Sequence, residues 1–365
     1  MDNSFIPVSK PSITSLEIEY VSEAVRSTWI SSLGKYIDQL EKEFAEFCDC
    51  RYAVSLSNGT VAIHLALIAQ GIGEGDEVIV PDLSFIATAN GVLHAGAKPV
   101  FIDIEKDSLC MDPGLIEQAI TSRTKAIMPV HLYGHPANMV EINAIAERHN
   151  LLVIEDAAEA HGSTINNKKV GSWGHCATFS FYGNKNMTTG EGGMITTNDQ
   201  VLYERCRYLR DHAMSKEKRY WHTEVGYNYR MTNIQAALGC AQISRIDEFM
   251  KRRKQIYDLY HQELGSHPGI KLNRTANNTT NSYWLICVEV DGITYQERDN
   301  IMASMKLKGV DSRPYFYPMS HMPYFTKADT PVSDLKSQTG ICLPTYTDLT
   351  DDEVRRVSKA FKESL

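Results

Sequence analysis

The sequence predicts an α/β protein built on a large, mostly parallel β-sheet with helices on both faces. Short strand-like runs alternate with helical stretches through the first half of the chain, as in proteins with parallel sheets. These runs are continuously apolar rather than alternating, as expected when both faces of a sheet are covered. The length of 365 residues indicates about two domains.

Seven strands are expected in the first half of the chain, with helices at residues 60–70, 86–94 and 139–150 between some of them. The strands are expected at residues 52–57, 77–81, 99–104, 125–132, 151–155, 177–181 and 193–197. No long helix separates the last two strands. Because parallel neighbours need a long crossover connection, we expect these two strands to pair antiparallel.

The second half of the chain begins with a long helix over residues 232–264, which an interruption could divide, and continues with a polar loop at 273–281. Further strands and helices are expected at 282–290, 294–308, 310–315, 341–344 and 351–365. We place the domain boundary at the long helix. This gives a large domain over residues 1–245, including an N-terminal arm, and a smaller α/β domain over 246–365.

The composition excludes several classes of protein. The net charge is −8, with 43% hydrophobic residues and no basic block, so neither disorder nor binding to nucleic acid or anionic membranes is expected. No apolar run approaches the roughly 20 residues that a bilayer requires. Residues 1–10 lack the features of a signal peptide and the eight cysteines form no CxxC pair, so we expect a cytoplasmic protein with reduced thiols.

Two motifs carry little weight. The glycines of residues 71–76 follow a helix and precede a strand, which is the wrong order for a phosphate-binding turn. His131 and His135 have the spacing of metal ligands on a helix, but they lie in a predicted loop with Gly134 and Pro136. No metal site is therefore expected.

The segment from Asn58 through Gly59 to Thr60 has the order that phosphate binding requires. A strand ends, the chain turns, and a helix begins, so free N–H groups and the helix dipole face the carboxyl end of the strand. A simple helix cap would give the same pattern.

Charged residues gather at two further strand ends. Glu155, Asp156 and Glu159 follow an apolar strand together with His161, and buried carboxylates need partners such as a cation or a protonated heterocycle. Lys185 follows the strand that contains Ser180, and it could be either a surface residue or a partly buried amine able to form a Schiff base. A phosphate site, a strand-end Asp and a lysine together suit pyridoxal 5′-phosphate, whose protonated pyridine acts as an electron sink.

These residues lie within stretches that resemble the DegT/DnrJ/EryC1/StrS family of sugar-nucleotide aminotransferases. The resemblance runs over nearly the whole chain and implies the aspartate aminotransferase-like architecture known as fold type I. Within the family, the sequence most resembles the enzymes that convert GDP-4-keto-6-deoxymannose to GDP-perosamine. The matching stretches are residues 27–32, 57–66, 126–135, 153–160, 179–185, 190–194, 219–221, 226–233 and 312–314.

The resemblance implies a role for each cofactor contact. Lys185 would form the Schiff base and move a proton, and Asp156 would pair with the pyridine nitrogen. Gly59, Thr60 and Ser180 would bind the phosphate, Asn58 would be a further cofactor contact, and Phe85 would stack on the ring. Glu159 stands near the ring 3′-oxygen, where many members of the family have Gln. Asn228 would reach the cofactor phosphate of a neighbouring subunit, which implies a homodimer with shared active sites.

The resemblance also implies substrate contacts, in segments that line the sugar-nucleotide cleft of similar enzymes. These contacts are Trp29, Ser31, His161, Arg230, Arg313 and His321. Arg313 could hold a diphosphate through a bidentate fork or form a structural ion pair. His321 could be a simple loop residue.

The expected reaction is the amination of C4 of a nucleotide-linked 4-keto-6-deoxyhexose, with glutamate as amino donor, for surface polysaccharide (O-antigen) synthesis. The same chemistry on a dTDP- or UDP-linked sugar is an alternative. A related dehydratase would have His in place of Lys185, and a non-catalytic relative would lack Lys185 or Asp156. Both residues are present.

Overall fold

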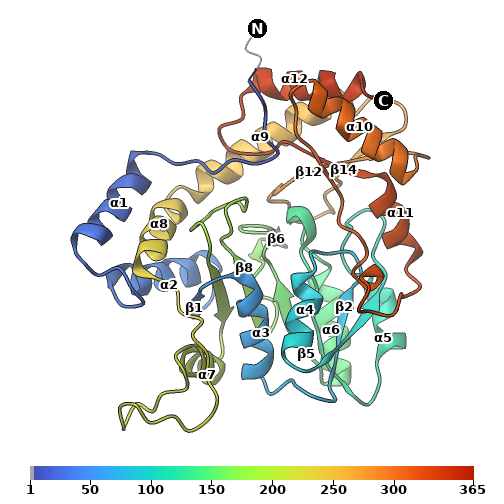
Figure 1. Cartoon of the computed structure of the whole chain (residues 1–365). Helices are drawn as coiled ribbons and strands as arrows, with labels where there is room; N and C mark the ends of the chain where they lie inside the picture. The colour runs from blue at the N-terminus through green and yellow to red at the C-terminus, as the bar shows by residue number, and fades with distance from the viewer. Residues whose placement is uncertain (1–3) are drawn as a thin grey trace.

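The structure, a computed structural model, describes residues 4–365 and consists of a larger and a smaller α/β unit (Figure 1). The larger unit contains a seven-stranded sheet in the order β1-β9-β8-β5-β4-β2-β3. Only β9 runs antiparallel to its neighbours, β1 and β8. The strands are β1 (Tyr52–Leu56), β2 (Glu77–Pro81), β3 (Lys98–Ile102), β4 (Thr124–Ile127), β5 (Leu152–Asp156), β8 (Cys176–Ser180) and β9 (Gly193–Thr197). The seven expected strands and the antiparallel pairing are thus confirmed.

Helices cover both faces of this sheet. One face packs against α3, α4 and α7, and the other against α2, α5, α6 and α8. Helix α3 is apolar on all sides and lies between the sheet and its neighbouring helices, so both of its faces are buried. The helices are α2 (Lys35–Phe47), α3 (Gly59–Ala69), α4 (Ala87–His94), α5 (Ile116–Ala119), α6 (Met139–His149), α7 (Gln200–Arg210) and α8 (Asn233–Ile243).

The register of the sheet brings the carboxyl ends of β1 and β8 to the same level. Leu56 of β1 and Ser180 of β8 both pair with Gly193, the first residue of β9. A Cβ atom on Gly193 would lie 2.3 Å from the carbonyl oxygen of Asn58, so only glycine allows the turn after β1 to pass this close. Asp156 of β5 pairs with Thr178 of β8 at the same edge. Residues from three strands are thus gathered there.

The smaller unit contains a four-stranded antiparallel sheet in the order β10-β12-β14-β13. Its strands are β10 (Ile270–Leu272), β12 (Ile286–Val290), β13 (Arg313–Pro314) and β14 (Gly340–Leu343), and its helices are α9 (Ile246–Leu264), α10 (Tyr295–Leu307), α11 (Pro331–Thr339) and α12 (Asp351–Lys362). Thr294 with Glu297, and Thr350 with Glu353, form capping boxes that fix the starts of α10 and α12.

The remaining elements connect the two units. A three-stranded sheet joins β6 (Thr164–Ile165) and β7 (Lys168–Lys169) to β11 (Thr279–Thr280). The N-terminal segment before α1 (Ser15–Arg26) runs along the smaller unit, where the N–H of Ile6 donates to Gly309 and the N–H of Thr345 donates to Val8. The 3₁₀ helices are η1 (Pro113–Leu115), η2 (Leu132–Gly134) and η3 (Met319–His321). In residues 4–365, no helix combines the length and apolar character needed to cross a bilayer.

The structure adds to the sequence expectations or differs from them at several places. The long helix is interrupted, as the sequence allowed, and forms two helices, α8 and α9, that are separated at Ser244 and Arg245. The expected domain boundary falls at this break and stays a prediction. Helix α11 was not expected, and residues 279–280 of the expected loop form β11 because they pair with β6. Residues 282–285, expected as strand, instead form an irregular segment beside the larger unit.

Arg253 of α9 fixes the junction between this segment and the smaller unit. Its side chain is buried, and its guanidinium donates to the carbonyl oxygens of Tyr283, Trp284 and Thr345 at 3.2, 2.9 and 3.4 Å. Burial lowers the pKa of Arg253 to about 10, because the cation is removed from water. The cation is compensated by carbonyl dipoles instead of a carboxylate.

We predict that Arg253→Leu lowers the free energy of unfolding of the apoprotein by about 2–4 kcal/mol, because three buried carbonyl groups lose their donor. Arg355, which is exposed and pairs with Asp352 on α12, supplies the control. Arg355→Leu should change the free energy of unfolding by less than about 0.5 kcal/mol. Denaturant unfolding measures both, and equal effects of the two substitutions would contradict the role of Arg253.

Candidate active site

The turn from β1 into α3 has the geometry of an anion site. Asn58 caps the helix, and its side chain accepts a hydrogen bond from the N–H of Val61 at 3.0 Å. A Cβ atom on Gly59 would lie 2.8 Å from the Cβ of Ser180, so glycine is required where the helix start meets the end of β8. First-turn N–H groups have no partner within a helix, so they and the Ser180 hydroxyl are available to a phosphate.

Asp156 ends β5 and is buried at the same edge of the sheet. One carboxylate oxygen accepts a hydrogen bond from Thr88 Oγ1 at 2.7 Å and the other from the N–H of Ala158 at 3.2 Å. Burial raises the pKa of Asp156, while the bond from Thr88 opposes that shift. A buried carboxylate needs a positively charged partner, and a protonated ring nitrogen opposite Asp156 would supply it.

Lys185 and Glu159 lie opposite each other, in the segments that follow β8 and β5. Lys185 Nζ lies 3.5 Å from Glu159 Oε1, and both side chains are largely buried. Glu159 Oε2 accepts a hydrogen bond from the N–H of Tyr133 at 2.9 Å. Tyr133 has a φ of 53°, the left-handed region that a residue with a Cβ seldom adopts. Burial raises the pKa of Glu159 to about 7, against the lowering influence of Lys185 and Tyr133.

Glu155 has a different environment from its two acidic neighbours. It points to the opposite face of β5, as successive residues on a strand do. Its carboxylate accepts hydrogen bonds from His131 Nε2 at 3.0 Å and from the N–H groups of Gly171, Trp173 and Gly174 at 2.8–2.9 Å. Glu155 is therefore fully occupied as a structural acceptor.

The two histidines of the expected loop are structural as well. His131 Nδ1 accepts from the N–H of Ala137 at 3.0 Å, so its Nε2 carries the proton donated to Glu155. His135 Nδ1 lies 2.7 Å from the carbonyl oxygen of Pro136, and its Nε2 accepts from the N–H of Ala276. In the described part of the chain, no group of three or more His, Cys, Asp or Glu side chains is arranged to hold a metal ion.

One cavity of about 660 Å³, which we call the lysine cavity, contains the expected cofactor contacts except Asn228. Those that line it are Asn58, Gly59, Thr60, Phe85, Asp156, Glu159, Ser180 and Lys185. Sequence reasoning missed Thr88, Tyr229 and Trp284, which also line it. Trp284 comes from the segment that Arg253 holds, about 100 residues beyond Lys185, and no local sequence signal marks it.

The residues of the lysine cavity fit pyridoxal 5′-phosphate. Because residue 59 is glycine, the start of α3 can approach Ser180 closely, which brings the first-turn N–H groups and the Ser180 hydroxyl together as donors for a phosphate. The buried carboxylate of Asp156 suits a protonated pyridine, and the Lys185 amine is available to an aldehyde. All three lie within the one cavity.

The expected substrate contacts are dispersed. Trp29 and Ser31 lie between α1 and α2, where their carbonyl oxygens accept hydrogen bonds from Asn233. His161 is fully buried among Phe44, Phe179 and Phe181, and burial lowers its pKa to about 3. None of these three expected contacts lines the lysine cavity.

Arg313 and His321 lie in different surroundings from each other. Arg313 is exposed, 3.2 Å from Asp311, and lines a groove of about 840 Å³ that adjoins the lysine cavity. We call this the aromatic groove, because Phe85, Phe316 and several tyrosines line it. His321 Nε2 lies 2.9 Å from Asp334, in a separate depression beside α11.

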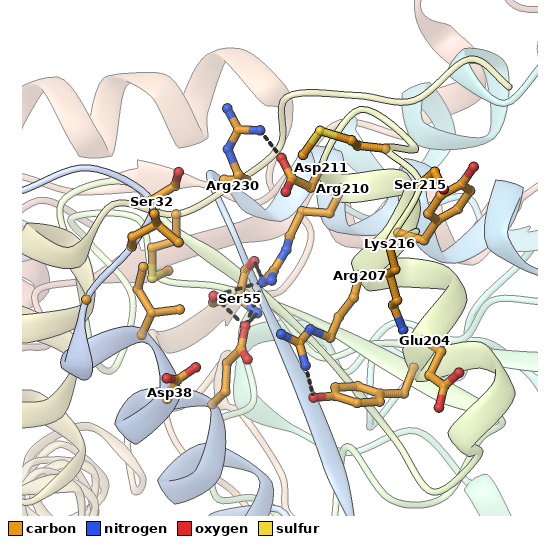
Figure 2. A pocket seen from close by; sticks show the side chains of 18 of the residues that line it. Ser32, Asp38, Ser55, Glu204, Arg207, Arg210, Asp211, Ser215, Lys216 and Arg230 are labelled. Carbon is orange, nitrogen blue, oxygen red and sulfur yellow. Dashed lines mark hydrogen bonds and ion pairs between the residues drawn. The ribbon is translucent and has the colours of Figure 1, made fainter. Parts of the chain in front are cut away.

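Arg230 lines a third cavity of about 710 Å³, between α2, α7 and the loop of residues 211–230 (Figure 2). Figure 2 shows Arg230 paired with Asp211, and Arg210 directed at Ser55. Arg210 also contacts Glu41 at 2.6 Å. Asn228 pairs with Asp211 through the backbone and does not line the lysine cavity of its own chain.

Comparison with known proteins shows the family of the chain. Residues 11–362 match the DegT/DnrJ/EryC1/StrS aminotransferase family. The chain belongs to this family. GDP-perosamine synthase from Escherichia coli O157:H7 is 44% identical over 98% of both chains, and that from Caulobacter vibrioides is 46% identical over 99% of this chain and 98% of its own. Spr1654 of Streptococcus pneumoniae, assigned as a sugar aminotransferase and solved in a PLP form, superposes with a TM-score of 0.94 at 30% identity, covering 99% of this chain and 98% of that one.

These comparisons confirm the expected family, the fold type I architecture and the aminotransferase activity. They also confirm pyridoxal 5′-phosphate as the cofactor. The roles of the individual site residues stay predictions.

We predict that Glu159→Gln stabilises the apoprotein in a pH-dependent way. The carboxyl has a pKa of about 7 in the folded chain against 4.5 as its ordinary value, so the folded state retains the proton more strongly than the unfolded state does. Glu159 therefore makes the folded state progressively less stable as pH rises from about 4.5 to 7. The glutamine removes this loss, so its advantage should grow over that window by up to about 3 kcal/mol and then level off. Denaturant unfolding of both apoproteins from pH 4 to 8 measures it, and a constant difference would contradict the buried-carboxyl account.

Proposed function

We propose that the chain converts GDP-4-keto-6-deoxy-D-mannose to GDP-perosamine, with L-glutamate as amino donor, for surface polysaccharide (O-antigen) synthesis. The observation that carries this proposal is the match to GDP-perosamine synthases over nearly the full length of each chain, including one from Vibrio cholerae at 41% identity. Lys185 and Asp156 share one cavity, which argues against a non-catalytic relative. A dTDP- or UDP-linked keto sugar stays the alternative substrate.

Each residue of the lysine cavity has a proposed role. When bound, pyridoxal 5′-phosphate supplies the electron sink that lets an amino group move between donor and acceptor. Gly59, Thr60 and Ser180 would bind its phosphate, Phe85 would stack on its ring, and Asp156 would keep its ring nitrogen protonated. The Lys185 amine moves the proton at the substrate carbon that gains or loses the amino group. Glu159, raised in pKa, lies beside that amine and can share its proton.

The aromatic groove is the proposed path for the sugar nucleotide. It opens from the lysine cavity, with which it shares Phe85, Tyr182, Trp284 and Phe316. Arg313 is the one charged residue among those of the described chain that line it. Aromatic rings suit a nucleobase, and an arginine fork suits a diphosphate.

We propose a homodimer with shared active sites. Asn228 and Arg230 lie outside the lysine cavity of their own chain, in the loop of residues 211–230 that projects from the body after α7 (Figure 1). Tyr220, Trp221 and Val225 in this loop are 75%, 53% and 80% exposed. Large exposed apolar side chains of this kind mark a protein–protein interface. A two-fold axis would bring each loop to the partner's site. The cysteines of the described chain are unpaired, which suits the cytoplasm, where we place the enzyme.

We predict that GDP-4-keto-6-deoxymannose gives the highest kcat/KM in a panel of GDP-, dTDP- and UDP-linked 4-keto-6-deoxy sugars, by at least about tenfold, because the nucleotide contacts distinguish the base. Steady-state transamination with glutamate measures it. Lys185→Ala serves as the control and should lose at least about 10²-fold in turnover, since it removes the amine that transfers the proton. A higher kcat/KM on a dTDP- or UDP-linked sugar would contradict the GDP assignment.

We predict that two inactive variants complement each other. Lys185→Ala subunits mixed with Asn228→Ala subunits form dimers in which one site has both an intact Lys185 and an intact Asn228. Random exchange makes half of the dimers mixed, so activity should recover to roughly a quarter of the wild-type value. The activity of the mixture after subunit exchange measures it. Mixed dimers that form and stay inactive would show that Asn228 does not act across the interface.

A further inference from the structure

Trp284 makes two contacts with the segment that carries Lys185. The Nζ of Lys185 lies 3.9 Å from the centre of the Trp284 ring. The indole Nε1–H donates to the carbonyl oxygen of Asn184 at 2.7 Å. Asn184 directly precedes Lys185. The tryptophan therefore contacts both the peptide group that joins Asn184 to Lys185 and the amine of the Lys185 side chain.

These two contacts limit where the Lys185 amine can be. The face of an indole ring attracts a cation, and the attraction is stronger where both groups are largely buried, as the side chains of Lys185 and Trp284 are. The hydrogen bond to Asn184 fixes the peptide group from which the lysine side chain starts. Glu159 contacts the same amine at 3.5 Å, and the nearby Asp156 carboxylate and His161 ring also interact electrostatically with Lys185. The amine is thus held between a ring face and a carboxylate.

The surroundings of Trp284 hold its ring firmly. Arg253 donates to its carbonyl oxygen at 2.9 Å. The ring of Tyr133 stacks on it, with centroids 6.2 Å apart and planes 15° from parallel. The adjacent Tyr283 has a φ of 47°, and the N–H of Ser282 donates to Gly134 at 3.1 Å. A tryptophan that is only 4% exposed and fixed from both units is a rigid support.

We propose that Trp284 is a positioning residue for Lys185, which keeps the amine turned into the lysine cavity and ready to bond to the cofactor. In that step Lys185 first gives up one proton of its ammonium group, which the Glu159 carboxylate beside it can accept. The neutral nitrogen and the aldehyde carbon of pyridoxal 5′-phosphate then form a C=N bond, and the aldehyde oxygen leaves as water with the two remaining hydrogens of the amine. The proposal rests on the proposed function only for its cofactor chemistry, which is the binding of pyridoxal 5′-phosphate by Lys185. It does not depend on the sugar nucleotide, and the experiment uses no sugar.

Trp173 provides a matched control elsewhere in the chain. Lys168 Nζ lies 4.5 Å from the centre of its ring, and its indole N–H donates to the carbonyl oxygen of Lys168 at 3.3 Å. It therefore makes the same two kinds of contact with a lysine segment. Trp173 does not line the lysine cavity, so its replacement leaves Lys185 untouched.

The test is the rate at which apoprotein gains the visible absorbance band on mixing with pyridoxal 5′-phosphate. Trp284→Leu removes both contacts and should slow the reaction by roughly tenfold. Trp284→Phe retains a ring face but loses the N–H donor, and it should be slowed by about threefold. Trp173→Leu should react at the wild-type rate. Wild-type rates in the two Trp284 variants would overturn the proposal.

Binding of pyridoxamine 5′-phosphate separates positioning from loss of shape. This form of the cofactor has no aldehyde and forms no bond with Lys185, so its Kd, measured by calorimetry, should stay within about twofold of wild type in the Trp284 variants. If the Kd of pyridoxamine 5′-phosphate rises by the same factor as the rate of the reaction falls, Trp284 only shapes the cavity. That result would overturn the proposal. If Trp284→Leu does not fold, Trp284→Phe decides alone, and a wild-type rate in that variant has the same consequence.

Discussion

One lysine and two carboxylates are buried at the carboxyl edge of the sheet. Much of the surrounding structure supplies the partners that these charged groups need. Charged groups removed from water need partners of fixed geometry. Thr88 and the N–H of Ala158 supply them for Asp156. Tyr133 takes a left-handed conformation that directs its N–H at Glu159. The lysine completes the arrangement, because its amine faces the second carboxylate.

The parts of the site that could be predicted from the sequence are those that sit at strand ends. Asn58 and Asp156 each lie two residues after the last apolar residue of a strand, and Lys185 lies in the turn after β8. A mostly parallel sheet brings such ends to one edge. The sequence did not separate Glu155 from Asp156, although adjacent strand residues face opposite sides. His161 follows the same strand, yet its ring lies in the phenylalanine core and does not line the cavity.

The remaining parts depend on segments that are distant in sequence. Trp284, Thr88 and Tyr229 reach the cavity from three separate regions. Trp284 and Thr88 lie outside the stretches that match the family. Tyr229 lies within one of them, but the contacts expected there were its neighbours Asn228 and Arg230. The same limit applies to His131 and His135. Their spacing suggested metal ligands, and only their buried partners show that each has one ring nitrogen that accepts from a backbone N–H. The irregular segment 282–285 could not be distinguished from a strand, because its conformation is set by Arg253 and Gly134.

The N-terminal segment has a consequence for the order of folding. Ile6 bonds to Gly309 and Val8 to Thr345, so the first described residues complete a unit whose other parts are among the last to be synthesised. Contacts of such long sequence separation slow folding, because a large loop must close before they can form. On the ribosome, the larger sheet can assemble before the residues that pair with residues 4–9 have been synthesised. The smaller unit and Trp284 can join it only near the end of translation, so a chain truncated before that point would have Asp156 and Lys185 but an incomplete cofactor cavity.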